Sequence, residues 1–324
     1  MFSYRFFLKQ AWNITKKYRH LWFFGIFAAF IAVGGEYQII GQGLTSEPGG
    51  IFASSGFLLL YSFFNPSFYQ GLGNLASTNP AAFWSLISVS LLVLALIAII
   101  IYLAVISQVA IIKQSAAIII SKKKNNNLTI GGGLEDGRPH FWKVLALNII
   151  SSVIISLSFF IISLPLIFLF LTDAAAITVA YIILFIIFVP VALSIALIIK
   201  YAIAARVLEG GGFTASMSQG WNMFKKNWLV SLEMALILFI INFLVGLLTL
   251  IVLFLFFIPL FVLSIQLYSS LLTAISALLI IGVMIFAASI LNTFQISTWT
   301  GLYLHLQSKR GRSKLERLFH SSAR

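Results

Sequence analysis

Six long apolar segments are the feature that most limits what this chain can fold into. They lie near residues 21–41, 84–112, 144–171, 176–199, 229–264 and 273–304. A helix needs about 20 apolar residues to cross the hydrocarbon core of a bilayer. Only 9% of the 324 residues are charged, whereas soluble domains carry about 25%. The sequence therefore predicts an all-α, multi-pass protein, in which residues 1–324 form a single integral membrane domain with six transmembrane helices.

The basic residues predict how these segments are threaded through the bilayer. All 21 Lys and Arg residues precede segment 1, lie between segments 2 and 3 or between segments 4 and 5, or follow segment 6. The alternate loops, 42–83, 172–175 and 265–272, contain none of them. Because basic residues concentrate in cytoplasmic loops, we expect both termini in the cytoplasm and the protein in the plasma (inner) membrane. This asymmetry also accounts for the net charge of +13 without a nucleic-acid partner.

Three segments leave alternatives open. Residues 51–64 are apolar but short for a span, so they suit a re-entrant or interfacial piece. Residues 229–264 are long enough for one span or for two short ones, with Pro259 as a break point. Residues 1–33 have the basic start and apolar run of a cleaved signal peptide, but AAFIAVGGE is a weak cleavage context. We therefore expect the chain to keep this region as its first span.

Two basic stretches have the periodicity of amphipathic helices. In YRFFLKQAWNITKKYRHLW (4–22) and FTASMSQGWNMFKKNW (213–228), apolar residues recur every three or four positions and basic residues occupy the other face. Such helices typically lie in a membrane interface, and the basic tail 311–324 is a third candidate. The apolar faces consist of Tyr4, Phe7, Leu8, Ala11, Ile14, Tyr18 and Leu21 in the first stretch, and of Phe213, Met217, Trp221, Phe224 and Trp228 in the second.

These stretches also suggest an internal repeat. QAWNITKK (10–17) and QGWNMFKK (219–226) share Gln, Trp, Asn and both Lys in the same register. A Trp also follows each Gly-Gly-Gly run, eleven residues after its first Gly, at Trp142 and Trp221. The alternative is that basic, Trp-bearing segments arise generically where a chain enters the membrane. The candidate parallel repeats, each an interfacial segment plus a helical hairpin, are 1–120, 121–209 and 210–310.

The block AARVLEGGGFTASMSQGWNMFKKNW (204–228) resembles the glycerophosphoryl diester phosphodiesterase membrane-domain family and is similar to YciC-like bacterial inner-membrane proteins. The resemblance is specific over roughly 200–230, with a fainter echo at 8–24. It implies a six-span protein of a bacterial plasma membrane. The soluble phosphodiesterase domain that can accompany this membrane region has no counterpart here, so the resemblance implies no catalytic activity.

The polar stretches do not match known phosphate, metal or catalytic patterns. GGGLEDGRPHFW (131–142) has neither the Lys-Ser/Thr of a Walker loop nor the GxGxxG of a dinucleotide loop. GGGFTASMSQGW (210–221) precedes a helix whose N-terminus could hold an anion, although a flexible break before that helix explains it as well. The chain has no cysteine, and its histidines lack metal-ligand spacing. We therefore predict no catalytic residue, no cofactor and no metal. The four histidines are His20, His140, His305 and His320.

Polar residues inside the apolar segments are the best candidates for a site in the membrane, because burying them in lipid is costly. Glu36 lies near the outer end of the first segment and Glu233 about one turn into the fifth. Either could be a hydrated carboxylate at the interface, and the amides could simply hydrogen-bond between helices. The candidates are Glu36, Glu233, Asn148, Asn242, Asn292 and Gln295.

The basic residues near the membrane predict contacts with anionic lipid headgroups, because each Lys or Arg near such a surface contributes about 1 kcal/mol. The candidates are Lys16, Lys17, Lys122, Lys123, Lys124, Lys225, Lys226, Lys309 and Arg310. The first functional hypothesis is a non-enzymatic scaffold or accessory subunit that organises lipid or a membrane protein partner, including a second copy. The second is a transporter or lipid-handling protein with a path between the hairpins. An intramembrane enzyme acting on lipid has the least support.

Overall fold

The computed structural model describes residues 4–32, 65–121, 129–169 and 174–308. All regular secondary structure in these ranges is helical, which confirms the all-α prediction for this part of the chain. The elements are α1 (Tyr4–Lys17), α2 (His20–Ala32), α5 (Pro66–Thr78), α6 (Pro80–Ser121), α7 (Ile130–Gly137), the 3-10 helix η1 (Arg138–His140), α8 (Phe141–Leu169), α9 (Ala174–Glu209), α10 (Phe213–Lys226), α11 (Trp228–Val252), the π-helical turn η2 (Leu253–Phe257), α12 (Ile258–Gln266) and α13 (Ser270–Ser308).

Five helical stretches are long and apolar enough to cross a membrane. They coincide with five of the six apolar segments, and the chain therefore has the helices of a multi-pass membrane protein. Part of the first segment, 21–41, forms α2, and the remainder lies outside the described residues. The five stretches are Pro80–Ser121, Ile130–Ser158, Ile182–Glu209, Trp228–Gln266 and Ser270–Gln307.

The long segment 229–264 forms one continuous helical stretch. It runs through α11, η2 and α12, and the π-helical turn ends two residues before Pro259. Proline lacks an N–H and crowds the preceding turn, and a single π turn is a common way to absorb such a change inside a helix. Pro190 likewise lies inside α9 without ending it. The short apolar segment 51–64 lies outside the described residues.

The chain forms two compact units. Unit 1 comprises Met1–Gly34, Leu103–Ser152 and Ser194–Arg324, and unit 2 comprises Gly35–Tyr102 and Val153–Leu193. In unit 2, α5 begins after Asn65, whose side chain accepts a hydrogen bond from the Ser67 amide at 3.1 Å. This helix lies within the loop 42–83, for which the sequence predicted no helix.

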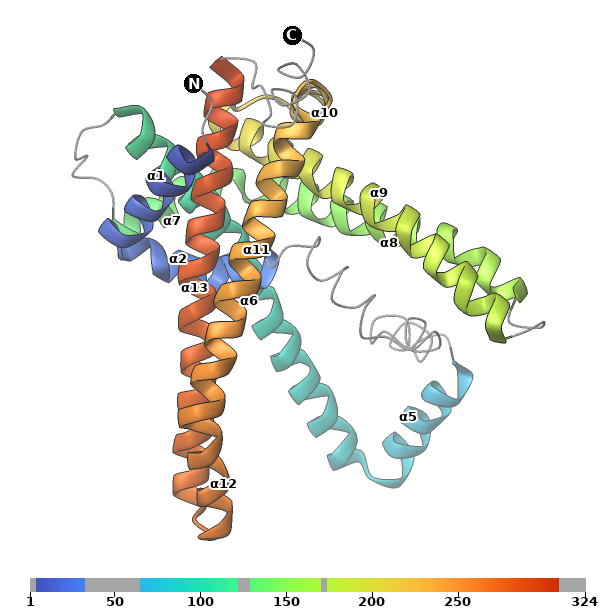
Figure 1. Cartoon of the computed structure of the whole chain (residues 1–324). Helices are drawn as coiled ribbons and strands as arrows, with labels where there is room; N and C mark the ends of the chain where they lie inside the picture. Colours follow the sequence, from blue (N-terminus) through green and yellow to red (C-terminus); the bar gives the residue numbers. More distant parts are fainter. Residues whose placement is uncertain (1–3, 33–64, 122–128, 170–173, 309–324) are drawn as a thin grey trace. The chain divides into compact units, whose positions relative to one another are not determined.

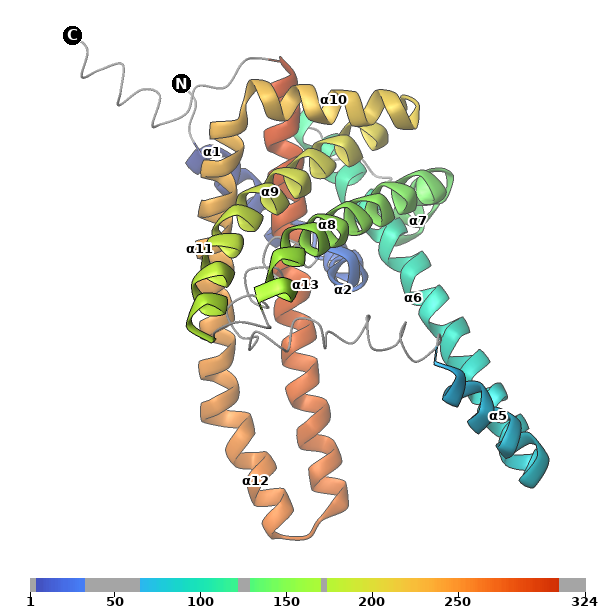
Figure 2. The same ribbon diagram turned by 90° about the vertical axis from the view of Figure 1, so that its right-hand side faces the viewer.

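Unit 1 is built around the second half of α13. Figures 1 and 2 show α1, α2 and α11 alongside this helix. The chain turns back after α12, so that the first half of α13 lies against α12. Every residue from Asn292 to Tyr303 is buried. Leu21 and Phe24 of α2, Val109 of α6 and Ala202 of α9 belong to the hydrophobic core of this unit.

Polar side chains of α13 bring α2 unusually close. Ser289 Oγ donates to the carbonyl oxygen of Trp22 at 2.5 Å, and Thr293 Oγ1 donates to that of Leu21 at 3.1 Å. Gly25 faces the same contact, where a Cβ would overlap the Ser289 carbonyl oxygen. Small residues at such contacts allow helix backbones to approach in a membrane, where dispersion and hydrogen bonds drive association.

The structure corrects the expected surroundings of the first amphipathic helix. The predicted helix is present as α1, but its apolar face packs on protein, chiefly on α13, rather than on lipid. Phe7 and Ala11 are buried there, and the Phe7 ring lies 5.2 Å from the His305 ring between centroids. Apolar periodicity shows only that a face avoids water, so it does not separate a lipid-facing helix from a protein-facing one.

The second amphipathic helix, α10, turns a different face to the protein. Its buried residues are the small Ser216 and Gly220, and a Cβ at Gly220 would lie 2.6 Å from the carbonyl oxygen of Ile198 in α9. Trp221 remains 53% exposed, and Trp228 at the start of α11 remains 55% exposed. The aromatic side chains of this region are therefore available to a membrane interface.

Candidate functional site

Polar residues of the apolar segments pair with one another inside unit 1. The Gln295 amide donates to the Asn242 side-chain oxygen, which joins α13 to α11. Asn148 Nδ2 donates to Gln108 Oε1 at 3.0 Å, which joins α8 to α6. The Tyr4 hydroxyl donates to the Glu233 carboxylate, which joins α1 to α11. Each of these sequence candidates thus makes a hydrogen bond between helices.

The remaining candidates do not complete one shared site. Asn292 is buried in α13, three residues before Gln295, with 5% of its surface exposed. Glu36 lies outside the described residues. The structure therefore brings Asn242 and Gln295 together, whereas Asn148 and Glu233 bond to Gln108 and Tyr4, which were not among the site candidates.

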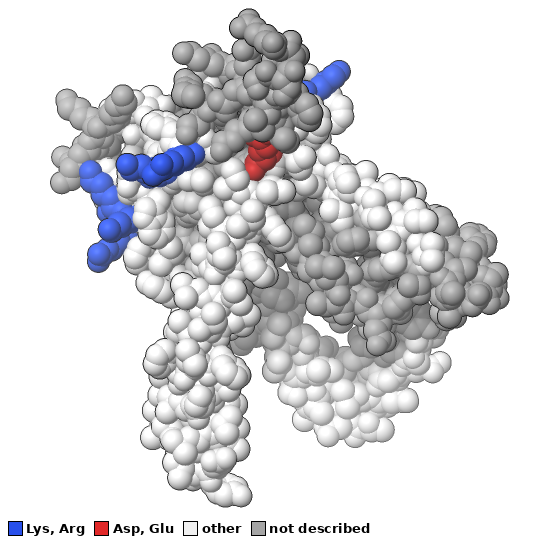
Figure 3. Space-filling view, viewed as in Figure 1, with Lys and Arg blue, Asp and Glu red and all other residues white. Residues whose placement is uncertain are grey.

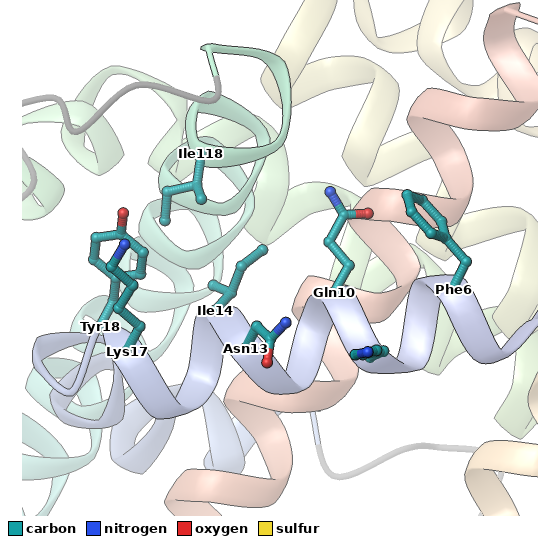
Figure 4. Close-up of a pocket in the computed structure, with 8 residues that line it drawn as sticks. Phe6, Gln10, Asn13, Ile14, Lys17, Tyr18 and Ile118 are labelled. Atoms are coloured by element: carbon teal, nitrogen blue, oxygen red, sulfur yellow. The ribbon is translucent and has the colours of Figure 1, made fainter.

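A groove of about 500 Å³ runs along the exposed side of α1 (Figure 4). Figure 4 shows Gln10, Lys17 and Tyr18 on the side of α1 that faces Ile118 of α6. The groove combines cationic, amide, hydroxyl and apolar groups. Its lining consists of Phe6, Lys9, Gln10, Asn13, Ile14, Lys17, Tyr18 and Ile118.

The candidate lysines within the described residues are all exposed. Lys16 and Lys17 end α1, and Lys225 and Lys226 end α10. On the face shown in Figure 3, Lys and Arg side chains lie around α1 and, at the upper right, near α10, and they are absent from the lower part of the hairpin of α11, α12 and α13. The other five candidates, Lys122, Lys123, Lys124, Lys309 and Arg310, lie outside the described residues.

Exposed tryptophans accompany these lysines. Trp12 and Trp221 each precede a lysine by one helical turn, at Lys16 and Lys225, and both are more than half exposed. Trp142, next to Lys143 in α8, is 77% exposed. Tryptophan favours the headgroup level of a bilayer, so these exposed side chains are candidates for contact with a membrane interface.

A separate hydrogen-bonded cluster joins the C-terminal ends of α9 and α13 to the middle of α10. The Glu209 carboxylate accepts hydrogen bonds from the Tyr303 hydroxyl and from Gln307 Nε2, the latter at 2.8 Å. Gln219 Nε2 of α10 donates to the same carboxylate at 2.5 Å and to the Tyr303 oxygen at 3.2 Å. Gly210 follows with a φ of 74°, a conformation that glycine adopts without strain, and α9 ends here.

Five buried polar atoms have no hydrogen-bond partner among the described residues: Ser107 Oγ, His140 Nδ1, Arg206 Nε, Asn242 Nδ2 and Trp299 Nε1. Arg206 still donates through Nη1 to the carbonyl oxygen of Gly210 at 2.8 Å, close to the end of α9. Lys200 Nζ lies 5.1 Å from the Trp299 ring centroid, a cation–π contact. Within the described ranges, no three His, Cys, Asp or Glu residues are grouped to hold a metal ion.

Part of the groove lining could have been predicted from the sequence. Lys9, Asn13 and Lys17 are spaced by four residues and therefore share one side of a helix. Ile118 comes from α6, a hundred residues further along the chain, and sequence spacing could not place it beside them. The Glu209 cluster was missed for the same reason, because its members lie on three helices, α9, α10 and α13.

Comparisons of this chain with protein-family models, with curated proteins and with solved structures gave no match. The resemblance of residues 204–228 to the glycerophosphoryl diester phosphodiesterase membrane-domain family therefore stays a prediction.

Proposed function

We propose that this protein is a non-enzymatic scaffold or accessory subunit of the plasma (inner) membrane, which organises anionic lipid or a partner protein through one basic face. The observation that supports the proposal is the pairing of exposed Trp and Lys on α1 and α10. Tryptophan prefers the headgroup level, and lysine beside it attracts anionic headgroups. The unit therefore offers a surface suited to lipid rather than to a soluble substrate.

The proposal includes six spans and a cytoplasmic location for both termini. The basic distribution supports it, because 21 Lys and Arg residues all fall on one set of loops. The similar ends of α1 and α10 support the parallel repeat, since both helices have 14 residues and end in Lys-Lys. Labelling of a single cysteine at position 225 from outside intact cells would contradict this threading.

Mass spectrometry after mild detergent extraction tests the lipid-organising role. We expect the extracted protein to retain anionic lipid several-fold above its share of the bulk membrane, because the exposed lysines favour negative headgroups. A wash at about 1 M salt, where charges are screened beyond about 3 Å, should remove much of this excess. Retention of lipids in bulk proportion, with no co-purifying protein, would overturn the proposal.

A substrate path between the hairpins is the second candidate function. Asn242 Nδ2 is buried and has no hydrogen-bond partner among the described residues, which is the observation that favours it. The pairing of Asn242 with Gln295 favours structural hydrogen bonding instead. The stability of variants at these two positions separates the two interpretations.

We expect Asn242→Leu and Gln295→Leu each to lower the free energy of unfolding by about 1–2 kcal/mol, because each leaves its partner buried without the bond. The double variant should be close to the wild type, since no orphaned amide remains. Detergent-titrated unfolding in mixed micelles measures all four proteins in one double-mutant cycle. Unchanged stability in both single variants would instead favour a hydrated path.

A further inference from the structure

We propose that the groove along α1 binds the phosphate of an anionic glycerophospholipid. The inference rests on the proposed function and names the place on the basic face where a lipid is recognised. Two lysines, Lys9 and Lys17, line the groove, and Gln10 and Asn13 lie between them in the sequence. Ammonium groups bind phosphate by charge-assisted hydrogen bonds, and the side-chain amides can donate to the remaining phosphate or glycerol oxygens.

Among the described residues, no acidic side chain compensates the charge of the groove. None of its eight lining residues is acidic. Within the described part of the chain, the one ion pair joins Lys113 to Asp136 at 3.6 Å and involves neither Lys9 nor Lys17. Lys17 Nζ does lie 5.7 Å from the Tyr18 ring centroid, which directs the ammonium group along the wall of the groove. An anion is therefore the complementary ligand.

The dimensions favour a lipid over free phosphate. Lys9 and Lys17 are eight residues apart, or about 12 Å along the helix axis, whereas a phosphate group spans only a few ångströms. The groove volume of about 500 Å³ lies in the range of sites for small organic ligands. Phe6 is 62% exposed, and Ile118 lines the groove with it. These apolar side chains suit the start of the acyl chains.

The groove is held in place before a ligand arrives. The opposite face of α1 is buried, with Tyr4, Phe7 and Ala11 each exposing less than 5% of their surface. Trp22 Nε1 of α2 also donates to the Thr15 carbonyl oxygen at 2.9 Å, near the end of α1. Binding to a preformed groove requires little ordering of the protein, so the entropic cost of binding is small.

Lipid titration of the purified full chain, followed by native mass spectrometry, tests the site. The probes are phosphatidylglycerol and phosphatidylcholine, with glycerol phosphate as a soluble competitor. We expect Lys9→Ala/Lys17→Ala to weaken phosphatidylglycerol binding at least about ten-fold, because the variant removes both cationic side chains that line the groove. Lys225→Ala/Lys226→Ala removes the same charge from another part of the basic face, outside the groove. It should weaken binding by a clearly smaller factor, about two- to three-fold. Gln10→Leu keeps the charge and should also weaken binding.

The outcomes distinguish this inference from the proposed function. If the two double-lysine variants weakened phosphatidylglycerol binding equally, the groove would not be a specific site. The result would instead support a general basic face that attracts lipid. If the wild type showed no preference for phosphatidylglycerol over phosphatidylcholine, both the groove inference and the proposed lipid-organising function would be overturned. Full displacement of the lipid by an equal concentration of glycerol phosphate would show a soluble phosphate ligand and overturn the lipid assignment. Circular dichroism and size-exclusion chromatography establish that each variant is folded.

Discussion

Replacing Gly25 with alanine is expected to lower the free energy of unfolding by about 3 kcal/mol, at the upper end of the usual cost of overpacking. Gly25 lies where α2 contacts α13, and an added Cβ would overlap the Ser289 carbonyl oxygen and Thr293 Oγ1. A backbone oxygen inside a helix cannot rotate away from the new methyl group. The two helices must therefore separate, which lengthens the two hydrogen bonds that α13 side chains donate to α2 carbonyl oxygens.

The matched control is Gly282→Ala, which lies in α13 itself. Apart from the local helix backbone, nothing lies within 4 Å of a Cβ added there, and alanine is favoured over glycine in a helix interior by about 1 kcal/mol. The same chemical change should therefore destabilise at position 25 and stabilise at position 282. Detergent-titrated unfolding followed by circular dichroism measures both. Effects of the same sign at the two positions would show that α2 and α13 do not approach as closely as the structure has them.

The positions of most helices along the chain were predictable, because helix formation in these segments depends on local composition. Five apolar segments became long helices, since each has enough apolar residues to satisfy its backbone internally in lipid. The helical period of residues 4–22 also predicted a helix that is present as α1, but it did not predict that α1 ends at Lys17 and that α2 begins at His20. The helix α5 was missed, because PSFYQGLGNLAST has two glycines and lies in a stretch assigned as a loop on charge alone.

The contacts of these helices were beyond prediction from one sequence. Nothing in the period of α1 indicates that α13 covers its apolar face, because lipid tails and core side chains are equally apolar. The partner of Asn242 lies 53 residues away, at Gln295. The Glu209 carboxylate looked like an ordinary charge at the end of a helix. Only the fold places the Tyr303 hydroxyl and two amides around it.

Replacing Tyr303 with alanine should lower the free energy of unfolding by about 3–5 kcal/mol, the range for truncating a fully buried aromatic residue. Tyr303 is completely buried in α13, and its ring centroid lies 6.4 Å from that of Tyr201 in α9. Its hydroxyl adds the bond to Glu209, beside Gln219 of α10. The substitution thus leaves a cavity and also removes one of the bonds that fasten α9, α10 and α13.

Tyr303→Phe separates these two contributions. It keeps the ring and removes the hydroxyl, so we expect a loss of about 1 kcal/mol, because Glu209 is exposed and still accepts from Gln219 and Gln307. Tyr268→Ala removes a tyrosine that is 96% exposed in the turn after α12 and should leave stability unchanged. Unfolding in mixed micelles ranks the three variants. A loss for Tyr303→Phe as large as that for Tyr303→Ala would mean that the hydroxyl, rather than the packing of the ring, holds these helix ends together.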